Sequence, residues 1–312
     1  MTDGERLPIG LVLPTWPRHG GGHASWPELR QLARDAEALG IDTIWVPDHL
    51  QRRVRDRPAF GFRECWTILT AAAEATTTIE VGPFVACTGF RNPGLLARMA
   101  STLDEVSGGR LVLGLGPGNP ATDETWHAFG FDAARPVSRF EQSVEVIARL
   151  LREPPVTFRG DLVAVDGADI LPRGPRDAIP VWLAASGRRT LGIAARWADA
   201  VNVNTPLAGA ADAAAIVERV SDACRRVNRD PATLEVTGWA RLSLQAVGTA
   251  VARPGWIGGT PDEAAATMRA IHAAGVRHLT LYLGDAGDPS PTPALTATVL
   301  ERFVPFLDAV RA

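Results

Sequence analysis

The sequence predicts one domain, residues 1–312, folded as a single (β/α)8 barrel, the TIM-barrel form of the α/β class. Three observations predict this fold. Short apolar runs alternate with amphipathic segments along the chain, and no linker interrupts them. The first apolar run is followed by Pro14-Thr15-Trp16-Pro17 instead of a glycine-rich dinucleotide motif. Eight such strand–helix units favour a closed ring over an open sheet.

Eight apolar runs have the length and composition of buried strands. The third run ends in Cys87-Thr88-Gly89 and the fourth in Gly116-Pro117-Gly118-Asn119, so both junctions leave backbone room for a ligand. The expected strands are residues 9–13, 43–46, 79–86, 111–115, 179–184, 200–203, 234–244 and 279–283.

The segments between these strands carry helix signals. Ser25 and Glu28 have the spacing of a capping box, and so do Ser138 and Glu141. Asn92 can cap a further helix, because a proline pre-set for the first turn follows it. The expected helices are residues 25–40, 64–76, 92–106, 138–151, 187–197, 210–227, 260–275 and 294–310.

The chain is longer than the roughly 250 residues typical of this barrel, so we expect insertions. The main one lies at residues 154–179, where polar and apolar residues alternate as in a hairpin and the segment ends in Pro and Gly. A second is expected at residues 246–259.

Composition excludes several classes of function. A net charge of -3 argues against a nucleic-acid surface, although all 32 cations are arginine. Three cysteines without a CxxC pair indicate neither a disulfide framework nor a metal site. The N-terminus does not have the pattern of a secretory signal, and no run reaches the ~20 apolar residues of a membrane span. We therefore expect a cytoplasmic protein that contacts no membrane.

The functional groups of such a barrel lie at the carboxyl ends of its strands. Asp48 and His49 follow the second strand, and Asn119 follows the fourth. We expect His49, oriented by Asp48, to lie nearest the reacting atom, because imidazole titrates near neutral pH. The alternative is an ordinary structural hydrogen bond within this pair. The loop after the first strand adds Trp16 and His19 to the candidates.

An anion site is expected after the fifth strand. There Ala185, Ser186 and Gly187 open a helix whose first turn carries Arg188 and Arg189. Free N–H groups, a hydroxyl and cations at a helix N-terminus attract a phosphate. The alternative is a plain helix cap.

Four segments together resemble the luciferase-like monooxygenase family. They are PDHL (47–50), FRNPGLLARMASTLDEVSGGRLVLGLGPGN (90–119), HAFGF (127–131) and PVWLAASGRRTLGIAARWADA (180–200). The resemblance covers nearly the whole chain. It implies a (β/α)8 barrel that binds either FMN or the deazaflavin coenzyme F-420 at the strand ends.

The resemblance also implies site residues. It places a non-prolyl cis peptide bond between Phe84 and Val85, behind the cofactor ring, and the cofactor phosphate on residues 185–188. The residues expected beside the ring are Phe84, Val85, Ala86, Cys87, Thr88 and Asn119. A thiolate role for Cys87 is not expected, because no particular histidine partners it in the sequence.

The choice of reaction depends on two departures from the family pattern. Sugar and alcohol dehydrogenases of the family have a glutamate after the fourth strand and a tryptophan one turn after the histidine, where this chain has Asn119 and Arg53. Asp-His after the second strand is frequent in members that use F-420. We therefore expect reduced F-420 to donate hydride to an electron-poor C=C or C=N bond of a small organic molecule.

Two alternatives accompany this expectation. One is a two-component monooxygenase that uses reduced FMN and O2, and the other is a flavin-binding barrel without catalysis. The sequence shows no nicotinamide domain of the reductase type, so a separate reductase is expected to supply the reduced cofactor. The other expected partners are the substrate and a second copy of the chain in a homodimer.

Overall fold

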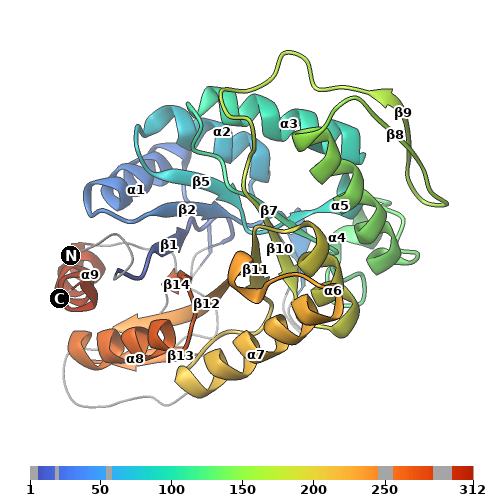
Figure 1. Ribbon diagram of the computed structural model, residues 1–312. Coiled ribbons are helices and arrows are strands. Elements are labelled where there is room, and N and C mark those ends of the chain that lie inside the picture. Colours follow the sequence, from blue (N-terminus) through green and yellow to red (C-terminus); the bar gives the residue numbers. More distant parts are fainter. Residues whose placement is uncertain (1–5, 18–20, 54–57, 245–255, 284–296, 312) are drawn as a thin grey trace.

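The computed structural model describes residues 6–17, 21–53, 58–244, 256–283 and 297–311. Figure 1 shows strands gathered around one axis and helices packed outside them. The barrel strands are β1 (Ile9–Val12), β2 (Thr43–Val46), β5 (Glu80–Pro83), β6 (Ala86–Cys87), β7 (Leu113–Gly116), β10 (Val181–Ala185), β11 (Ala200–Val203), β12 (Glu235–Leu244) and β14 (His278–Leu283). The helices are α1 (Trp26–Ala38), α2 (Cys65–Ala75), α3 (Pro93–Val106), α4 (Thr125–Ala128), α5 (Pro136–Arg152), α6 (Arg188–Trp197), α7 (Ala210–Arg226), α8 (Pro261–Ala273) and α9 (Ala297–Arg311).

The barrel strands pair in parallel in the order β5-β2-β1-β14-β12-β11-β10-β7-β6. Strands β5 and β6 are successive pieces of one barrel strand, separated by Phe84 and Val85. The ring closes beside Val81. Its N–H donates to Arg110 O and its carbonyl accepts from Val112 N–H, and each N···O distance is 3.0 Å. The predicted (β/α)8 barrel is confirmed, with element ends shifted by a few residues. That it forms one domain stays a prediction.

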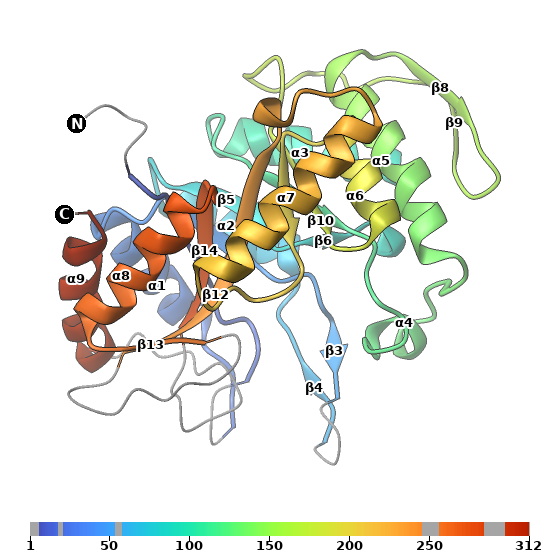
Figure 2. The same cartoon turned by 60° about the horizontal axis from the view of Figure 1, so that its bottom comes forward.

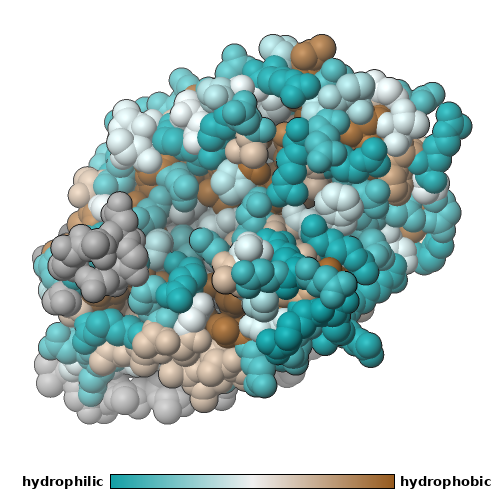
Figure 3. Space-filling view, viewed as in Figure 1, coloured by the Kyte–Doolittle hydropathy of each residue, from teal (hydrophilic) through white to brown (hydrophobic). Residues whose placement is uncertain are grey.

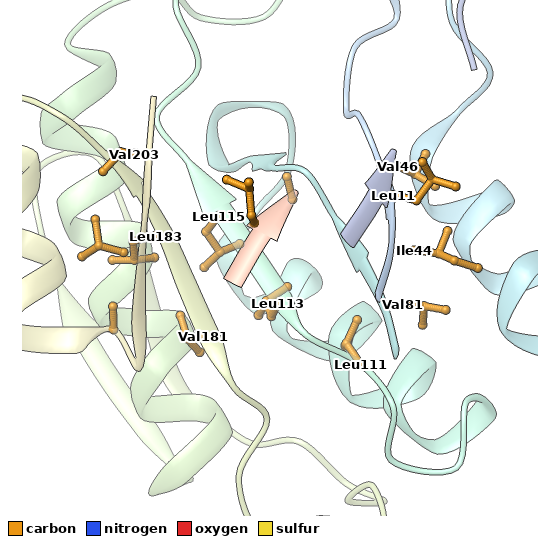
Figure 4. Close-up of a cluster of buried hydrophobic side chains, with 14 of the residues drawn as sticks. Leu11, Ile44, Val46, Val81, Leu111, Leu113, Leu115, Val181, Leu183 and Val203 are labelled. Atoms are coloured by element: carbon orange, nitrogen blue, oxygen red, sulfur yellow. The ribbon is translucent and has the colours of Figure 1, made fainter. Parts of the chain in front are cut away.

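The outer face of the barrel carries the main hydrophobic core. Alternate residues of each strand point outward and pack under the helices. Figure 4 shows this layer, which includes Leu11, Ile44, Val46, Val81, Leu111, Leu113, Leu115, Val181, Leu183 and Val203, all of them buried. Burial of these side chains against the helices is the main apolar contribution to stability.

Two tryptophans fill the middle of the barrel. The ring centroids of Trp45 and Trp182 are 5.1 Å apart, and the His278 ring stands nearly perpendicular to both. Glycines face these rings, because a Cβ atom at Gly10 would lie 2.2 Å from Nε1 of Trp45 and one at Gly82 2.5 Å from its ring. The interior is therefore packed, and ligand space must lie towards the strand ends.

The insertions only partly follow the prediction. Strands β8 (Val156–Arg159) and β9 (Ala164–Ala168) form the expected antiparallel hairpin. A second hairpin, β3 (Gln51–Arg52) with β4 (Phe60–Gly61), was not predicted, because its strands are too short to show a pattern. Figure 2 shows this hairpin projecting from the barrel. Of the insertion expected at 246–259, only β13 (Trp256–Gly259) lies within the described residues, and it pairs with β12. His19, a candidate site residue from the sequence, lies outside the described residues.

The capping box predicted at Ser138 and Glu141 is wrong. Helix α5 begins earlier, at Pro136, and Arg135 is its N-cap, with a φ of 48°. The side chains of Ser138 and Glu141 instead accept hydrogen bonds from Arg189 of α6, at 3.1 and 2.6 Å. Ser138 and Glu141 lie inside the helix, which starts two residues before Ser138, and their side chains join α5 to α6.

In the described parts of the chain, no helix is both long and apolar enough to cross a membrane. On the face shown in Figure 3, hydrophobic residues lie scattered among hydrophilic ones.

The packed interior generates a prediction for Gly82→Ala. A Cβ atom there would lie 2.4 Å from the carbonyl oxygen of Val112, which is backbone and cannot move aside cheaply. We expect Gly82→Ala to lower the free energy of unfolding, measured in urea, by about 1–3 kcal/mol. The control is Gly192→Ala in α6, where a Cβ atom meets nothing within 4 Å and helix propensity should add about 0.5–1 kcal/mol. Equal stability of the two variants would contradict the packing argument.

Candidate active site

The third barrel strand is broken by a bulge between β5 and β6. The Phe84–Val85 peptide bond in this bulge is cis, as the sequence resemblance implied. The side chain of Val85 packs on β7, where a Cβ atom at Gly116 would come within 2.6 Å of it. The ring of Phe84 lies inside the barrel, 6.1 Å from the ring of Tyr282 on β14. The bulge therefore carries an apolar ring into the barrel mouth.

Asp48 fastens this bulge to the end of β2. Its Oδ2 atom accepts a hydrogen bond from Cys87 N–H at 2.9 Å and from Nη1 of Arg91 at 2.6 Å, and its Oδ1 atom accepts from Nη2 of Arg91 at 3.0 Å. The side chain of Asp48 is 1% exposed. Arg91 also pairs with Glu64, the N-cap of α2, at 3.0 Å. One arginine therefore connects three segments of the barrel mouth.

The prediction that Asp48 orients His49 is wrong. Neighbouring residues at a strand end point to opposite sides, so the two side chains diverge. Nδ1 of His49 lies 2.6 Å from Oδ2 of Asp123, in the loop after β7. Burial raises the pKa of Asp123, but its hydrogen bonds with His49 and Thr125 outweigh burial and hold that pKa below its ordinary value. Asp123 is thus a carboxylate that holds the imidazole.

His49 stands at an accessible position in the mouth. Its side chain is 31% exposed, and its ring centroid lies 5.2 Å from that of Phe62. No described residue bonds its other ring nitrogen, Nε2. Sequence reasoning missed Asp123, because an acid 74 positions away in a loop gives no local signal.

Asn119 shapes the loop that carries Asp123. Its backbone carbonyl accepts hydrogen bonds from the N–H groups of Thr122 and Asp123, at 3.1 and 2.9 Å. Its Oδ1 atom accepts from Ala121 N–H at 3.2 Å. The structure thus ties Asn119 to the turn that delivers Asp123 to His49, rather than directly to His49.

The remaining bulge residues are buried beside β7. Ala86, Cys87 and Thr88 are each at most 5% exposed, and the Thr88 hydroxyl donates to Gly116 O at 3.3 Å. Burial raises the pKa of the Cys87 thiol to about 12, so it stays protonated at neutral pH. This agrees with the expectation that Cys87 is not a nucleophile.

The anion site expected after β10 differs from the prediction at Ser186 and Gly187. The N–H groups of Ser186 and Gly187 both donate to Oγ1 of Thr190, at 3.3 and 3.1 Å, so a protein acceptor already satisfies them. Arg189 is engaged by α5. Arg188 is exposed and, within the described ranges, forms no ion pair. The first N–H groups of α6 have no acceptor within the helix, so they and Arg188 remain for an anion.

Aromatic rings and buried polar atoms line the rest of the mouth. The ring centroid of Tyr282 lies 5.9 Å from that of Trp16 and 5.4 Å from that of Trp239. Asn202 on β11 and Thr280 on β14 face inward, because the residues flanking them pack in the outer core. Their Nδ2 and Oγ1 atoms are buried and have no partner among the described residues. Such a mouth suits a flat ring with polar edges.

The fold and this site define a (β/α)8 barrel with a candidate ligand-binding mouth at its strand ends. The sequence model of the family described as luciferase-like monooxygenase matches residues 7–253, and the chain belongs to that family. The chain is 28% identical over 217 residues to the 5,10-methylenetetrahydromethanopterin reductase of Methanolobus tindarius, covering 70% of this chain and 61% of that protein.

A second relative is the F-420-dependent glucose-6-phosphate dehydrogenase of Intrasporangium calvum. It is 33% identical over 156 residues, which cover 49% of this chain and 46% of that protein. The chain therefore spans less than two thirds of the length of either relative. A solved F-420-dependent secondary alcohol dehydrogenase, in complex with an F-420–acetone adduct, superposes with a TM-score of 0.79 at 17% identity. The match covers 98% of this chain and all of that one, and it shows the shared fold.

The bonds of Asp48 lead to a stability prediction. Asp48→Asn leaves the buried guanidinium of Arg91 without its closest negative charge. We expect the free energy of unfolding to fall by about 3 kcal/mol in urea denaturation. The matched control is Asp166→Asn, because the side chains of Asp166 and its partner Arg159 are both 79% exposed, and such a pair contributes less than about 1 kcal/mol. Similar losses in the two variants would show that the Asp48 pair does not organise the mouth.

Proposed function

We propose that this chain is an oxidoreductase in which reduced F-420 transfers hydride to a small organic substrate. The observation that carries the proposal is the His49–Asp123 pair, because it sets a proton donor at the mouth, near the bulge and the aromatic rings. The F-420-dependent names of a relative and of a structural neighbour support the choice of cofactor. The Asp-His sequence after β2 supports it as well.

The residues of the mouth fit such a cofactor. The unpartnered Nδ2 of Asn202 and Oγ1 of Thr280 suit the polar edge of its ring. Phe84, Val85, Ala86, Cys87 and Thr88 would lie beside that ring, and Arg188 with the start of α6 would hold its phosphate. When bound in its reduced form, F-420 supplies a hydride.

The proton is the contribution of the protein. Asp123 accepts a hydrogen bond from Nδ1–H of His49 and stabilises the imidazolium, so Nε2–H can donate its proton to the substrate atom that becomes basic. The aromatic rings around the mouth limit access of water to that step. Asn119 acts through Asp123 by holding its loop, and its amide cannot act as the acid or base that the family resemblance associates with alcohol oxidation at this position. Reduction of a C=C or C=N bond is therefore the favoured reaction.

The second candidate is a monooxygenase that uses reduced FMN and O2. The name of the family favours it. For either cofactor we propose that a separate reductase supplies the reduced form, that the chain works as a homodimer and that it resides in the cytoplasm.

Parallel titration of the purified chain with F-420 and FMN, each oxidised and reduced, tests the proposal. We expect tighter binding of F-420, and with reduced FMN no O2 consumption beyond the autoxidation measured without the protein. Tighter FMN binding with O2-dependent turnover would establish the monooxygenase instead. Cofactor binding without turnover of unsaturated or imine acceptors would leave a binding barrel.

The role of His49 predicts a specific kinetic loss. We expect His49→Ala to slow the chemical step by roughly 10²–10⁴-fold and to leave cofactor affinity nearly unchanged. Asp123→Asn should also slow this step, because the imidazolium loses its counter-charge. Single-turnover oxidation of reduced F-420 measures the step. Full turnover by His49→Ala would remove the proton-donor role, and loss of the cofactor would make His49 a binding residue.

The place of the cofactor phosphate predicts the effect of Gly187→Asp. A side chain fits there, since the nearest atom to an added Cβ is Oγ1 of Thr190 at 3.7 Å, and Asp is a good N-cap. We expect thermal stability to be kept and F-420 affinity to fall at least tenfold, about 1.4 kcal/mol, because the carboxylate repels the phosphate. Gly187→Ala is the control and should bind normally. Unchanged affinity in Gly187→Asp would place the phosphate elsewhere.

A further inference from the structure

Arg241 occupies an unusual place at the mouth of the barrel. It lies in β12, and its flanking residues Ala240 and Leu242 pack in the outer core, so its side chain faces the mouth. Its neighbours across the sheet are Trp256 on β13 and Tyr282 on β14. The guanidinium carbon lies 5.1 Å from the ring centroid of Trp239 and 6.0 Å from that of Trp256. Two indoles therefore flank this cation.

No acid compensates the charge of Arg241 within the described part of the chain. Burial lowers its pKa, and Tyr282 is the one described group that raises it. Arg52 lies opposite Phe60 in the β3–β4 hairpin, and Phe60 packs against the same apolar cluster as Tyr282, so Arg52 adds a second cation on this side of the mouth. Both arginines lower the pKa of the Tyr282 phenol against the effect of burial. The Nε atom of Arg52 is buried without a described partner. The next residue, Arg53, pairs instead with Glu124.

Two half-buried cations that have no acidic partner among the described residues favour an anionic ligand. The indoles lie against the guanidinium of Arg241, and its N–H groups suit the paired oxygens of a carboxylate or phosphate. A neutral ligand would leave these donors desolvated and unpaired. The aromatic side chains beside them suit a flat apolar group next to the anion.

The position of Arg241 separates this anion from the cofactor. In the ring order of the strands, β12 stands opposite the β5–β6 bulge, with three barrel strands between them on either side. The proposed phosphate site follows β10, which is separated from β12 by β11. Arg241 therefore faces the bulge across the mouth, on the side left for the substrate.

We propose that Arg241 and Arg52 form an oxyanion subsite for the substrate, which carries a carboxylate or a phosphate ester on a flat apolar skeleton. The assignment of this anion to the substrate rests on the proposed function. The subsite itself is testable without any cofactor.

The test is calorimetric titration of the cofactor-free full chain with cinnamate, phenyl phosphate and the neutral cinnamamide. We expect cinnamate or phenyl phosphate to bind at millimolar concentration or below, and cinnamamide to bind at least tenfold more weakly. Arg241→Gln and Arg52→Gln should each weaken binding of the anion at least tenfold and leave cinnamamide unaffected. The control is Arg226→Gln, an exposed arginine in the last turn of α7. Which anion binds more tightly distinguishes a carboxylic acid from a phosphate ester.

Several outcomes would overturn the proposal. One is the absence of saturable binding of both anions to the unaltered chain. Another is anion binding by Arg241→Gln and Arg52→Gln that is as tight as that of the unaltered chain. The third is binding of cinnamamide as tight as that of cinnamate. Titration with F-420 separates this result from the proposed function. Unchanged F-420 affinity in Arg241→Gln supports a substrate subsite, whereas a loss would assign the arginine to the cofactor. Failure of the unaltered chain to bind F-420 would reject the proposed cofactor and leave the anion result standing.

Discussion

The buried ion pair between Asp48 and Arg91 is the contact on which the mouth of this barrel depends. Removing two charges from water is costly, and the cost is offset only where further hydrogen bonds complete the pair. Cys87 N–H and the carboxylate of Glu64 supply those bonds. The pair therefore fixes the end of β2 to the bulge and to the start of α2. Because the side chain of Asp48 is buried towards Arg91, the side chain of His49 points to the loop after β7, where it meets Asp123.

The same constraint divides the charges of the mouth between two sides. Asp48 and Asp123 are both engaged, one with Arg91 and the other with His49. Neither is available to neutralise Arg241 and Arg52 across the barrel. One side of the mouth thus holds His49, the proposed proton donor, near the cis bulge, and the other holds two arginines that have no acidic partner among the described residues. A ligand between them would meet the proposed proton donor at one end and the proposed anion subsite at the other.

The packed interior gives this arrangement a rigid floor. Trp45 and Trp182 fill the barrel because Gly10 and Gly82 leave the space that their rings need. Above them the inward residues change from apolar rings to polar atoms, such as Nδ2 of Asn202, that lack partners in the described structure. The change from close packing to unsatisfied polar groups marks the depth at which a ligand can begin.

The sequence by itself determined the barrel, because strand runs, the cap of α1 at Ser25 and the turn glycines are local signals. The resemblance to the family added the cis bond at Phe84–Val85. Only the tertiary structure decided the partners of side chains. The partner of His49 is Asp123 and not Asp48, and the N–H groups of Ser186 and Gly187 donate to Thr190. These choices depend on which loops the closed ring brings together, and residues far apart along the chain carry no local trace of that proximity.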